Sequence, residues 1–230
     1  MPKTVISLRG IRKQFGRLDV LADTDLTLYG GSIVRLSGRN GSGKSTLLRI
    51  LAGDLSPDSG AIEIDGVVRG TLTVSAARSL GISVAYQDLA LCDHLTVLEN
   101  IFLGREVRLH KARLVPLGLP DRNAMRSVAE DMVNRLGVSL DVRGTSLLGL
   151  SGGQRQAIAL CRALVPTSRV LLLDEPTAAL DAFVRARVYG IIEERRAAGT
   201  AVMLISHEDI SAVLPTAVNV QLDDGNLRQV

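Results

Sequence analysis

The chain has 230 residues, of which 46% are hydrophobic and 22% are charged, and a chain of this size and composition buries a full core, which excludes wholesale disorder. Its net charge of +3, from 27 basic and 24 acidic side chains, is too balanced for a protein that coats nucleic acid. Two cysteines, Cys92 and Cys161, cannot build a disulfide framework or a zinc cage, so we expect reduced, packed thiols. The N-terminal segment lacks the pattern of a signal peptide, and no apolar window has the length of a membrane span.

Apolar runs and periodic stripes predict alternating strands and helices in the first half of the chain. Residues 33–37 are typical of a strand that runs into a glycine-rich loop, and a helix is predicted directly after that loop over 44–52. Residues 62–66 alternate in polarity and then turn, which indicates an antiparallel strand. Another strand is predicted over 82–86.

The second half continues this alternation with longer helices. A stripe with a period of 3.6 residues predicts a helix over 122–136. The stripe comprises Met125, Val128, Met132, Val133 and Leu136. Further helices are predicted over 152–165 and 182–197. The continuous apolar runs at 170–173 and 202–206 predict central strands that are buried on both faces.

Strands near both ends and a helix-rich middle predict a single α/β domain over residues 1–230. We expect about residues 1–87 and 151–230 to form its core and about residues 88–150 to be a mostly helical insertion. The basic, proline-containing stretch at 105–120 is interpreted as a solvated loop. His94 and His110 stand in no motif and are interpreted as surface or loop residues.

A glycine-rich loop between the first predicted strand and helix matches the phosphate-binding pattern G-x-x-x-x-G-K-[ST]. Its residues are Gly38, Arg39, Asn40, Gly41, Ser42, Gly43, Lys44, Ser45 and Thr46. The glycines let successive backbone N–H groups point inward, and these groups form a socket for phosphates together with the start of the following helix. Lys44 adds a positive charge for the terminal phosphates, and the Ser45 hydroxyl is placed to bind Mg²⁺.

Two acidic residues, Asp174 and Glu175, end the apolar run at 170–173. A carboxylate at the tip of a central strand beside a phosphate-binding loop suits Mg²⁺ binding, which we assign to Asp174. The neighbouring Glu175 would then act as the general base that polarises an attacking water.

A second glycine-rich turn opens the helix predicted over 152–165 and indicates a second anion site in the same chain. It comprises Leu150, Ser151, Gly152, Gly153 and Gln154. Leu-Ser-Gly-Gly-Gln is the signature sequence of the ATP-binding-cassette (ABC) ATPase family, and here it is unaltered. The sequence resembles this family from about residue 5 to residue 221. The resemblance implies a P-loop NTPase fold, with a RecA-like parallel sheet core, an N-terminal antiparallel β subdomain and a helical insertion.

The resemblance also implies roles for four residues outside these loops. Phe15 occupies the position of the aromatic residue that stacks on adenine, although a core phenylalanine is the alternative. Gln87 resembles the glutamine that senses Mg²⁺ and the γ-phosphate, and Asp181 resembles the aspartate of the loop along the dimer interface. His207 resembles the switch histidine at the γ-phosphate. One departure is Ala178, where family members more often have serine.

The expected ligands are ATP and Mg²⁺, and the expected reaction is ATP hydrolysis. In the family two cassettes close head-to-tail on two ATP molecules, so that Ser151 and Gly153 of one chain would complete the site of the other. Because all motifs are intact, a homodimer is expected to have two competent sites.

Three uses of ATP are compatible with the motifs. The first is to power a membrane transporter, with membrane permease subunits as partners and with this chain at the cytoplasmic face of the membrane. Residues 88–104 would then form the docking groove, to which Leu89, Leu91, Leu95 and Phe102 contribute apolar surface unless they belong to the core. The alternatives are a non-transport ATPase of the iron–sulfur assembly or cell-division type, and a nucleic-acid or ribosome-acting ATPase. The third is disfavoured because the chain has neither a long coiled coil nor a second cassette, and we expect no nucleic-acid partner.

Within transport, the run from Leu95 to Glu106 resembles bacterial carbohydrate importers, especially its Glu-Asn-Ile-Phe-Leu-Gly-Arg-Glu part. Sugar import would add a periplasmic or extracellular substrate-binding protein as a partner. Export of a lipid or drug is the alternative, and many of those importers fuse two cassettes where this sequence has one.

Overall fold

The computed structural model describes residues 4–108, 119–143 and 146–229. Most of the loop predicted at 105–120, with His110, therefore lies outside the described residues. The chain divides into two compact units, and the chain passes between them more than once.

The first unit comprises Met1–Val84, Thr167–Pro176 and Tyr189–Val230, and it contains two sheets. One is a four-stranded sheet in the order β2-β1-β4-β5. Its strands are β1 (Thr4–Phe15), β2 (Leu18–Tyr29), β4 (Ser59–Ile64) and β5 (Val67–Arg69). Each pair of neighbours is antiparallel, which confirms the antiparallel strand predicted at 62–66. Helix α2 (Val74–Ser79) follows this sheet in the chain.

The other sheet of this unit has six strands in the order β10-β9-β3-β8-β7-β6. They are β3 (Ile33–Ser37), β6 (Ile82–Ala85), β7 (Val170–Asp174), β8 (Ala201–Ile205), β9 (Ala217–Asp223) and β10 (Asn226–Gln229). The register is parallel from β9 through β3 and β8 to β7, and every residue of β7 and β8 is buried, as predicted for central strands. Parallel strands place their carboxyl ends at one edge, where the site residues lie.

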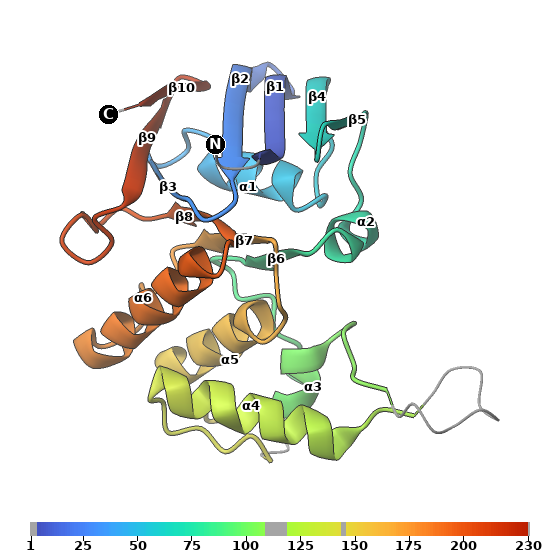
Figure 1. Cartoon of the computed structure of the whole chain (residues 1–230), viewed down its shortest axis with the longest axis vertical. Helices are drawn as coiled ribbons and strands as arrows, with labels where there is room; N and C mark the ends of the chain where they lie inside the picture. Colours follow the sequence, from blue (N-terminus) through green and yellow to red (C-terminus); the bar gives the residue numbers. More distant parts are fainter. Residues whose placement is uncertain (1–3, 109–118, 144–145, 230) are drawn as a thin grey trace. The chain divides into compact units, whose positions relative to one another are not determined.

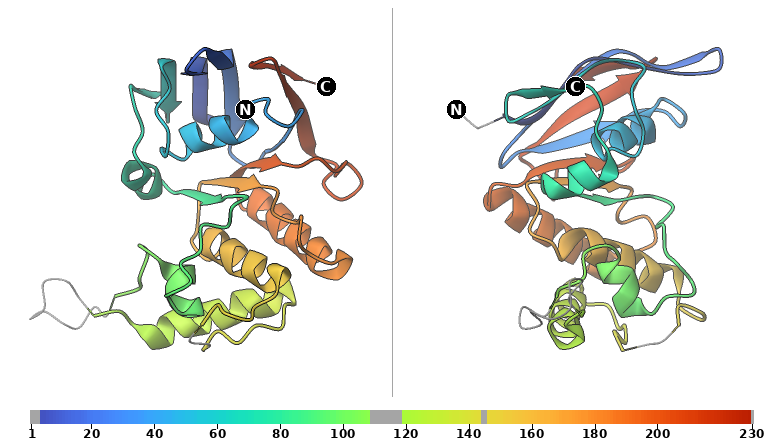
Figure 2. Two further views of the ribbon diagram at one scale, coloured as in Figure 1. Left: turned by 180° about the vertical axis from the view of Figure 1, so that it is seen from behind. Right: turned by 90° about the vertical axis from the view of Figure 1, so that its right-hand side faces the viewer.

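Helix α1 (Lys44–Leu51) lies beneath the antiparallel sheet in Figure 1. Leu47, Leu48 and Leu51 are buried, as the predicted apolar face requires. The two sheets of this unit meet where β10 lies beside β2 in Figures 1 and 2. There the Gly225 carbonyl accepts hydrogen bonds from the Ala22 amide at 2.9 Å and from the Thr24 hydroxyl at 2.6 Å.

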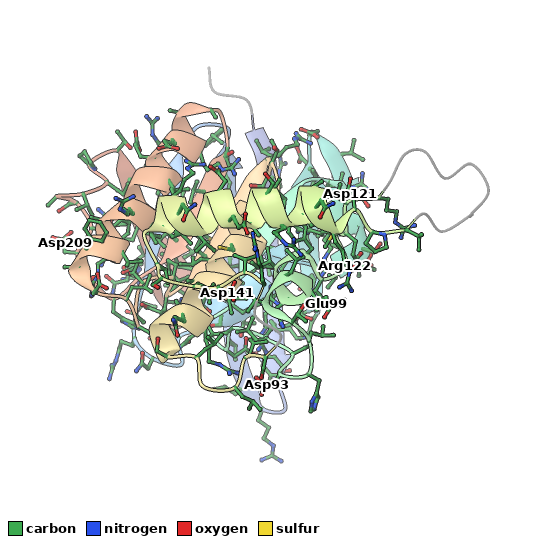
Figure 3. The ribbon with its side chains drawn as sticks, turned by 90° about the horizontal axis from the view of Figure 1, so that it is seen from below. Asp93, Glu99, Asp121, Arg122, Asp141 and Asp209 are labelled. Carbon is green, nitrogen blue, oxygen red and sulfur yellow. The ribbon has the colours of Figure 1, made fainter. Side chains whose placement is uncertain are left out.

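The second unit comprises Ala85–Pro166 and Thr177–Val188 and is helical. Its helices are α3 (Val97–Phe102), α4 (Arg122–Leu136), α5 (Gly152–Leu164) and the beginning of α6 (Ala182–Ala197). Helix α5 packs against both α3 and α4. Figure 3 shows Glu99 of α3 close to Arg122 at the start of α4, and these side chains form an ion pair at 3.1 Å.

Two details of the packing correct the sequence analysis. Val128 lies at the edge of the apolar stripe of α4 and is 43% exposed, because residues 125, 129, 132 and 136 form the buried row at helical spacing. Cys161 is a free, buried thiol as expected, and burial raises its pKa to about 12, but Cys92 is a free, exposed thiol instead of a packed one. None of the described helices has the length and the apolar composition needed to cross a membrane.

Candidate functional site

The phosphate-binding loop connects the carboxyl end of β3 to the first residue of α1, as its sequence predicts. Gly38, Gly41 and Gly43 have positive φ angles of 145°, 80° and 101°, a backbone region that residues with a Cβ rarely adopt. A Cβ on Gly38 would lie 2.4 Å from the Leu222 carbonyl oxygen, and one on Gly43 would lie 2.8 Å from the Val20 carbonyl oxygen. Glycine is therefore required at both positions for the loop to keep its curl.

Lys44 reaches back over this loop from the first turn of α1. Its Nζ donates hydrogen bonds to the carbonyl oxygens of Gly38 at 2.8 Å and Arg39 at 2.9 Å. Burial lowers the pKa of Lys44, while the charges of Asp174 and Glu175 raise it. The arrangement keeps an ammonium group at the mouth of the loop, where terminal phosphate oxygens could take the place of the two carbonyls.

Ser45 and Asp174 are 129 positions apart in the chain, yet the Ser45 hydroxyl donates a hydrogen bond to Asp174 Oδ2 at 2.8 Å. Asp174 is the last residue of β7 and is buried, with 4% of its surface exposed. A hydroxyl and a carboxylate side by side are the oxygen ligands that Mg²⁺ binds in phosphate sites, so these residues fit the predicted metal. Water and phosphate oxygens would supply the remaining ligands of the metal.

Glu175 follows Asp174 in a left-handed backbone conformation, with φ of 48°. Its amide donates to the Ile205 carbonyl at 3.1 Å, and its Oε1 accepts a hydrogen bond from the His207 amide at 3.2 Å. The same oxygen lies 3.6 Å from His207 Nε2. Burial raises the pKa of Glu175, Asp174 adds to this effect, and His207 and Lys44 oppose it. The structure thus brings together the predicted base and the predicted switch histidine.

Phe15 ends β1, and half of its surface (50%) is exposed. The alternative of a core phenylalanine is therefore wrong. The exposed ring leaves a face for a planar ligand, which fits the predicted stacking on adenine.

The signature residues lie in the second unit, at the start of α5. Ser151 is the N-cap residue, and its hydroxyl accepts a hydrogen bond from the Gln154 amide at 3.2 Å, while the Gln154 side chain accepts one from the Ser151 amide at 3.0 Å. A Cβ on Gly153 would lie 3.2 Å from the Ala179 carbonyl oxygen. Ser151, Gly153 and Asp181 line a hollow of about 380 Å³ in this unit.

Asp181 and Gln87 also belong to the second unit. Asp181 Oδ1 accepts a hydrogen bond from the Val184 amide at 2.9 Å and so caps α6, and its side chain is exposed. Gln87 is exposed and follows β6 by two positions. The structure therefore places Lys44, Ser45, Asp174, Glu175 and His207 in the first unit, and it places Gln87, the signature and Asp181 in the second.

Sequence reasoning missed how the loop after Gln87 is held. Leu89 and Ala90 both have positive φ angles, of 57° and 45°, and both carbonyls accept hydrogen bonds from the Arg162 guanidinium of α5, that of Ala90 at 2.7 Å. Asp93 of the same loop pairs with Arg155 of α5 at 2.5 Å. No spacing rule connects these partners. Of the apolar groove residues predicted here, Phe102 belongs to the core, with 3% of its surface exposed.

A family model, curated relatives and solved structures all resemble this chain. The family model described as ABC transporter matches residues 21–178. The ribose import ATP-binding protein RbsA 2 of Burkholderia ambifaria is 39% identical over 212 residues, which are 91% of this chain and 40% of that protein. The fructose import ATP-binding protein FrcA of Rhizobium meliloti is 37% identical over 204 residues, which are 88% of this chain and 78% of that protein.

Among solved structures, a dimeric bacterial ABC transporter cassette has a TM-score of 0.84 and 24% identity, covering 98% of this chain and 97% of that chain. A second structure of that cassette, described as a post-hydrolysis state bound to ADP and phosphate, has a TM-score of 0.81 and 24% identity, with the same coverage of both chains. These likenesses confirm the predicted P-loop NTPase fold. The chain spans about 40% of the length of the ribose import relatives that it matches.

Proposed function

We propose a function from one premise: this chain belongs to the ABC transporter family. Its function is to bind and hydrolyse ATP with Mg²⁺ and thereby to power a membrane transporter that imports a sugar. The single observation that carries ATP hydrolysis is the hydrogen bond of 2.8 Å between Ser45 and Asp174, beside Lys44 and Glu175. Sugar import is supported by the printed names of the relatives, which are ribose and fructose import ATP-binding proteins.

One group of the described residues binds the phosphates and Mg²⁺, and another activates the attacking water. Backbone N–H groups of residues 38–45 and the Lys44 ammonium bind the phosphates, and Ser45 and Asp174 hold Mg²⁺, which neutralises phosphate charge when it is bound. Glu175 accepts a proton from the attacking water, and the raised pKa of its carboxyl group increases its affinity for that proton. His207, whose amide orients Glu175 Oε1, lies beside the base and would contact the γ-phosphate.

The partners follow from the same premise. A second cassette would supply Ser151 and Gly153 to the ATP bound at the P-loop of the first, and an exposed Ser151 is available for this contact. We infer a homodimer, membrane permease subunits and a substrate-binding protein outside the cell, with the chain at the cytoplasmic face of the membrane.

Substitution of Lys44 tests the binding site. Lys44→Ala should raise the Kd for Mg-ATP at least tenfold, because neutral N–H groups alone do not replace a charge-assisted bond to phosphate. Fluorescence titration with a labelled ATP measures the affinity. Arg49→Ala is the matched control, because Arg49 is an exposed cation on the same helix and its loss should leave the Kd unchanged. Wild-type affinity in Lys44→Ala would contradict the assigned site.

Transport is tested separately in cells. The chain is expressed together with a candidate sugar permease and substrate-binding protein, and uptake of radiolabelled ribose and fructose is measured. Uptake of either sugar that requires Lys44 supports sugar import. Export of a labelled lipid or drug by the same complex, without sugar uptake, would contradict it.

A further inference from the structure

A lysine lies against the aromatic ring that is proposed to stack on adenine. Lys13 and Phe15 are two positions apart in β1, on either side of a register shift in its pairing with β2. The Lys13 Nζ lies over the Phe15 ring, 5.6 Å from its centroid. This separation is within the range of a cation–π interaction, in which the ring quadrupole attracts the ammonium group.

The ammonium group itself is held in place by Asp58, which is 45 positions away in the chain. Lys13 Nζ donates a hydrogen bond to Asp58 Oδ1 at 2.6 Å, and Asp58 Oδ2 accepts a second bond from the Gln14 amide at 2.7 Å. The Asp58 amide completes the contact by donating to the Arg12 carbonyl at 2.9 Å. The hydrogen bond from Lys13 lowers the pKa of Asp58, so the carboxylate stays ionised.

Burial distinguishes Lys13 from an ordinary surface lysine. Only 14% of its side chain is exposed, whereas 47% of the Asp58 side chain and 50% of Phe15 are exposed. A half-exposed phenylalanine with no neighbour would sample several rotamers, and fixing one of them costs entropy when a ligand binds. A largely covered ammonium group, hydrogen-bonded to an Asp58 carboxylate that the Gln14 amide also holds, removes much of this freedom before the ligand arrives.

We propose that Lys13 is a positioning residue for the base of ATP: Asp58 fixes the Lys13 ammonium, and the ammonium holds the Phe15 ring so that its other face receives adenine. The inference rests on the proposed function, because it requires Phe15 to stack on adenine. The contact between Lys13 and Phe15 would affect binding of the adenine base and not binding of the phosphates.

The first experiment separates the base from the phosphates. Lys13→Met keeps an unbranched side chain and removes the charge. We expect its Kd for Mg-ATP to rise about two- to fivefold, the range set by a cation–π contact at a partly exposed site. The Kd for inorganic tripolyphosphate, which has no base, should stay at the wild-type value. Arg17→Met is the matched control, because it removes one exposed cation from the turn after Phe15 and should change neither affinity.

The second experiment is a double-mutant cycle with Phe15. Phe15→Ala should weaken ATP binding by itself, and Lys13→Met should add no further loss in that background, because the ring through which it acts is gone. Lys13→Arg, which keeps a cation, should restore most of the affinity, and Asp58→Asn should reproduce part of the Lys13→Met loss. Equal losses from Lys13→Met with and without Phe15, or equal losses for ATP and tripolyphosphate, would overturn the proposal.

The wild-type protein separates this proposal from the proposed function. If the wild type binds neither ATP nor tripolyphosphate, the proposed function fails. If it binds both and Lys13→Met still binds ATP with wild-type affinity, only the role of Lys13 fails. If Lys13→Met does not fold, the Lys13→Arg and Asp58→Asn proteins decide the question: wild-type ATP affinity in Asp58→Asn would overturn the proposal.

Discussion

Glu175 shows how a single residue is tuned by its surroundings. It follows a fully buried strand, its backbone is left-handed, and one of its carboxylate oxygens faces His207. Burial is the largest effect on its pKa and raises it above the ordinary value of 4.5. A base with a raised pKa accepts the proton of water more readily, provided that it is still ionised at the working pH.

The pH dependence of hydrolysis should report this carboxyl group. Because the base acts only when deprotonated, the rate should be full above the pKa of Glu175 and should be lost as pH falls through it. This loss should begin at a higher pH than for an ordinary glutamate with a pKa of 4.5. The measurement is kcat at saturating Mg-ATP between pH 5 and 8, with circular dichroism to show that the protein stays folded. A rate that stays constant down to the pH at which the protein unfolds would contradict the assignment.

Local chemistry explains which site residues the sequence predicted. Lys44 and Ser45 belong to an eight-position pattern, and Asp174 and Glu175 follow an apolar run, so spacing along the chain was sufficient to propose them as site residues. The contact between Lys13 and Asp58 joins residues 45 positions apart and is created by the pairing of β1 with β4. No pattern in one sequence contains that information.

At the scale of secondary structure, Ser151 has two tasks. Its hydroxyl caps α5 in a capping box with Gln154, and the same hydroxyl is proposed to contact the ATP of a second cassette. A substitution designed to test the second task therefore also weakens the helix. Arginine at position 151, for example, would remove the cap as well as block the contact.

Loss of the cap alone can be measured. Ser151→Ala should lower the free energy of unfolding by about 1 kcal/mol, the usual cost of removing an N-cap hydroxyl, since Ser151 is exposed and leaves no cavity. Ser151→Thr keeps a capping oxygen and should lose less. Urea denaturation followed by circular dichroism compares the two variants. Equal stability of Ser151→Ala and wild type would show that the cap contributes nothing.

The elements differ in how far the sequence predicted them. Helices α4 and α6 match their predicted bounds because each has a clear start and a glycine directly or shortly after its end, Gly137 and Gly199. The 12-residue strands β1 and β2 were not predicted from their pattern, because register shifts between them interrupt the alternation of polar and apolar residues. Helix α3, with six residues, is too short to show a helical period.

At the scale of the whole molecule, the residues proposed to recognise ATP are divided between two units of one chain. The composition and motifs predicted the fold, but a proposed homodimer is a property of two chains, and nothing in the spacing of one sequence fixes its partner. The matched relatives themselves differ in length, since the chain spans 40% of the ribose import protein and 78% of the fructose import protein.

A variant that binds ATP without hydrolysing it should reveal the assembly. Glu175→Gln keeps the shape of the side chain but cannot accept a proton from water, so hydrolysis should fall by about 10²- to 10⁴-fold. Binding should survive, because Lys44, Ser45 and Asp174 are unchanged, and the loss of one negative charge near the γ-phosphate favours bound ATP. Since hydrolysis is expected to open the dimer, the variant should accumulate as a closed dimer with ATP inside.

Size-exclusion chromatography in Mg-ATP distinguishes the two states. The wild type should elute mostly as a monomer of 24.5 kDa, and Glu175→Gln should elute at twice that mass. The double variant Lys44→Ala, Glu175→Gln is the control, and it should stay monomeric because it cannot bind the ATP that closes the dimer. Hydrolysis at the wild-type rate would remove Glu175 from the role of base. An inactive Glu175→Gln protein that binds ATP yet stays monomeric would instead contradict the homodimer and show that this chain requires a different cassette as its partner.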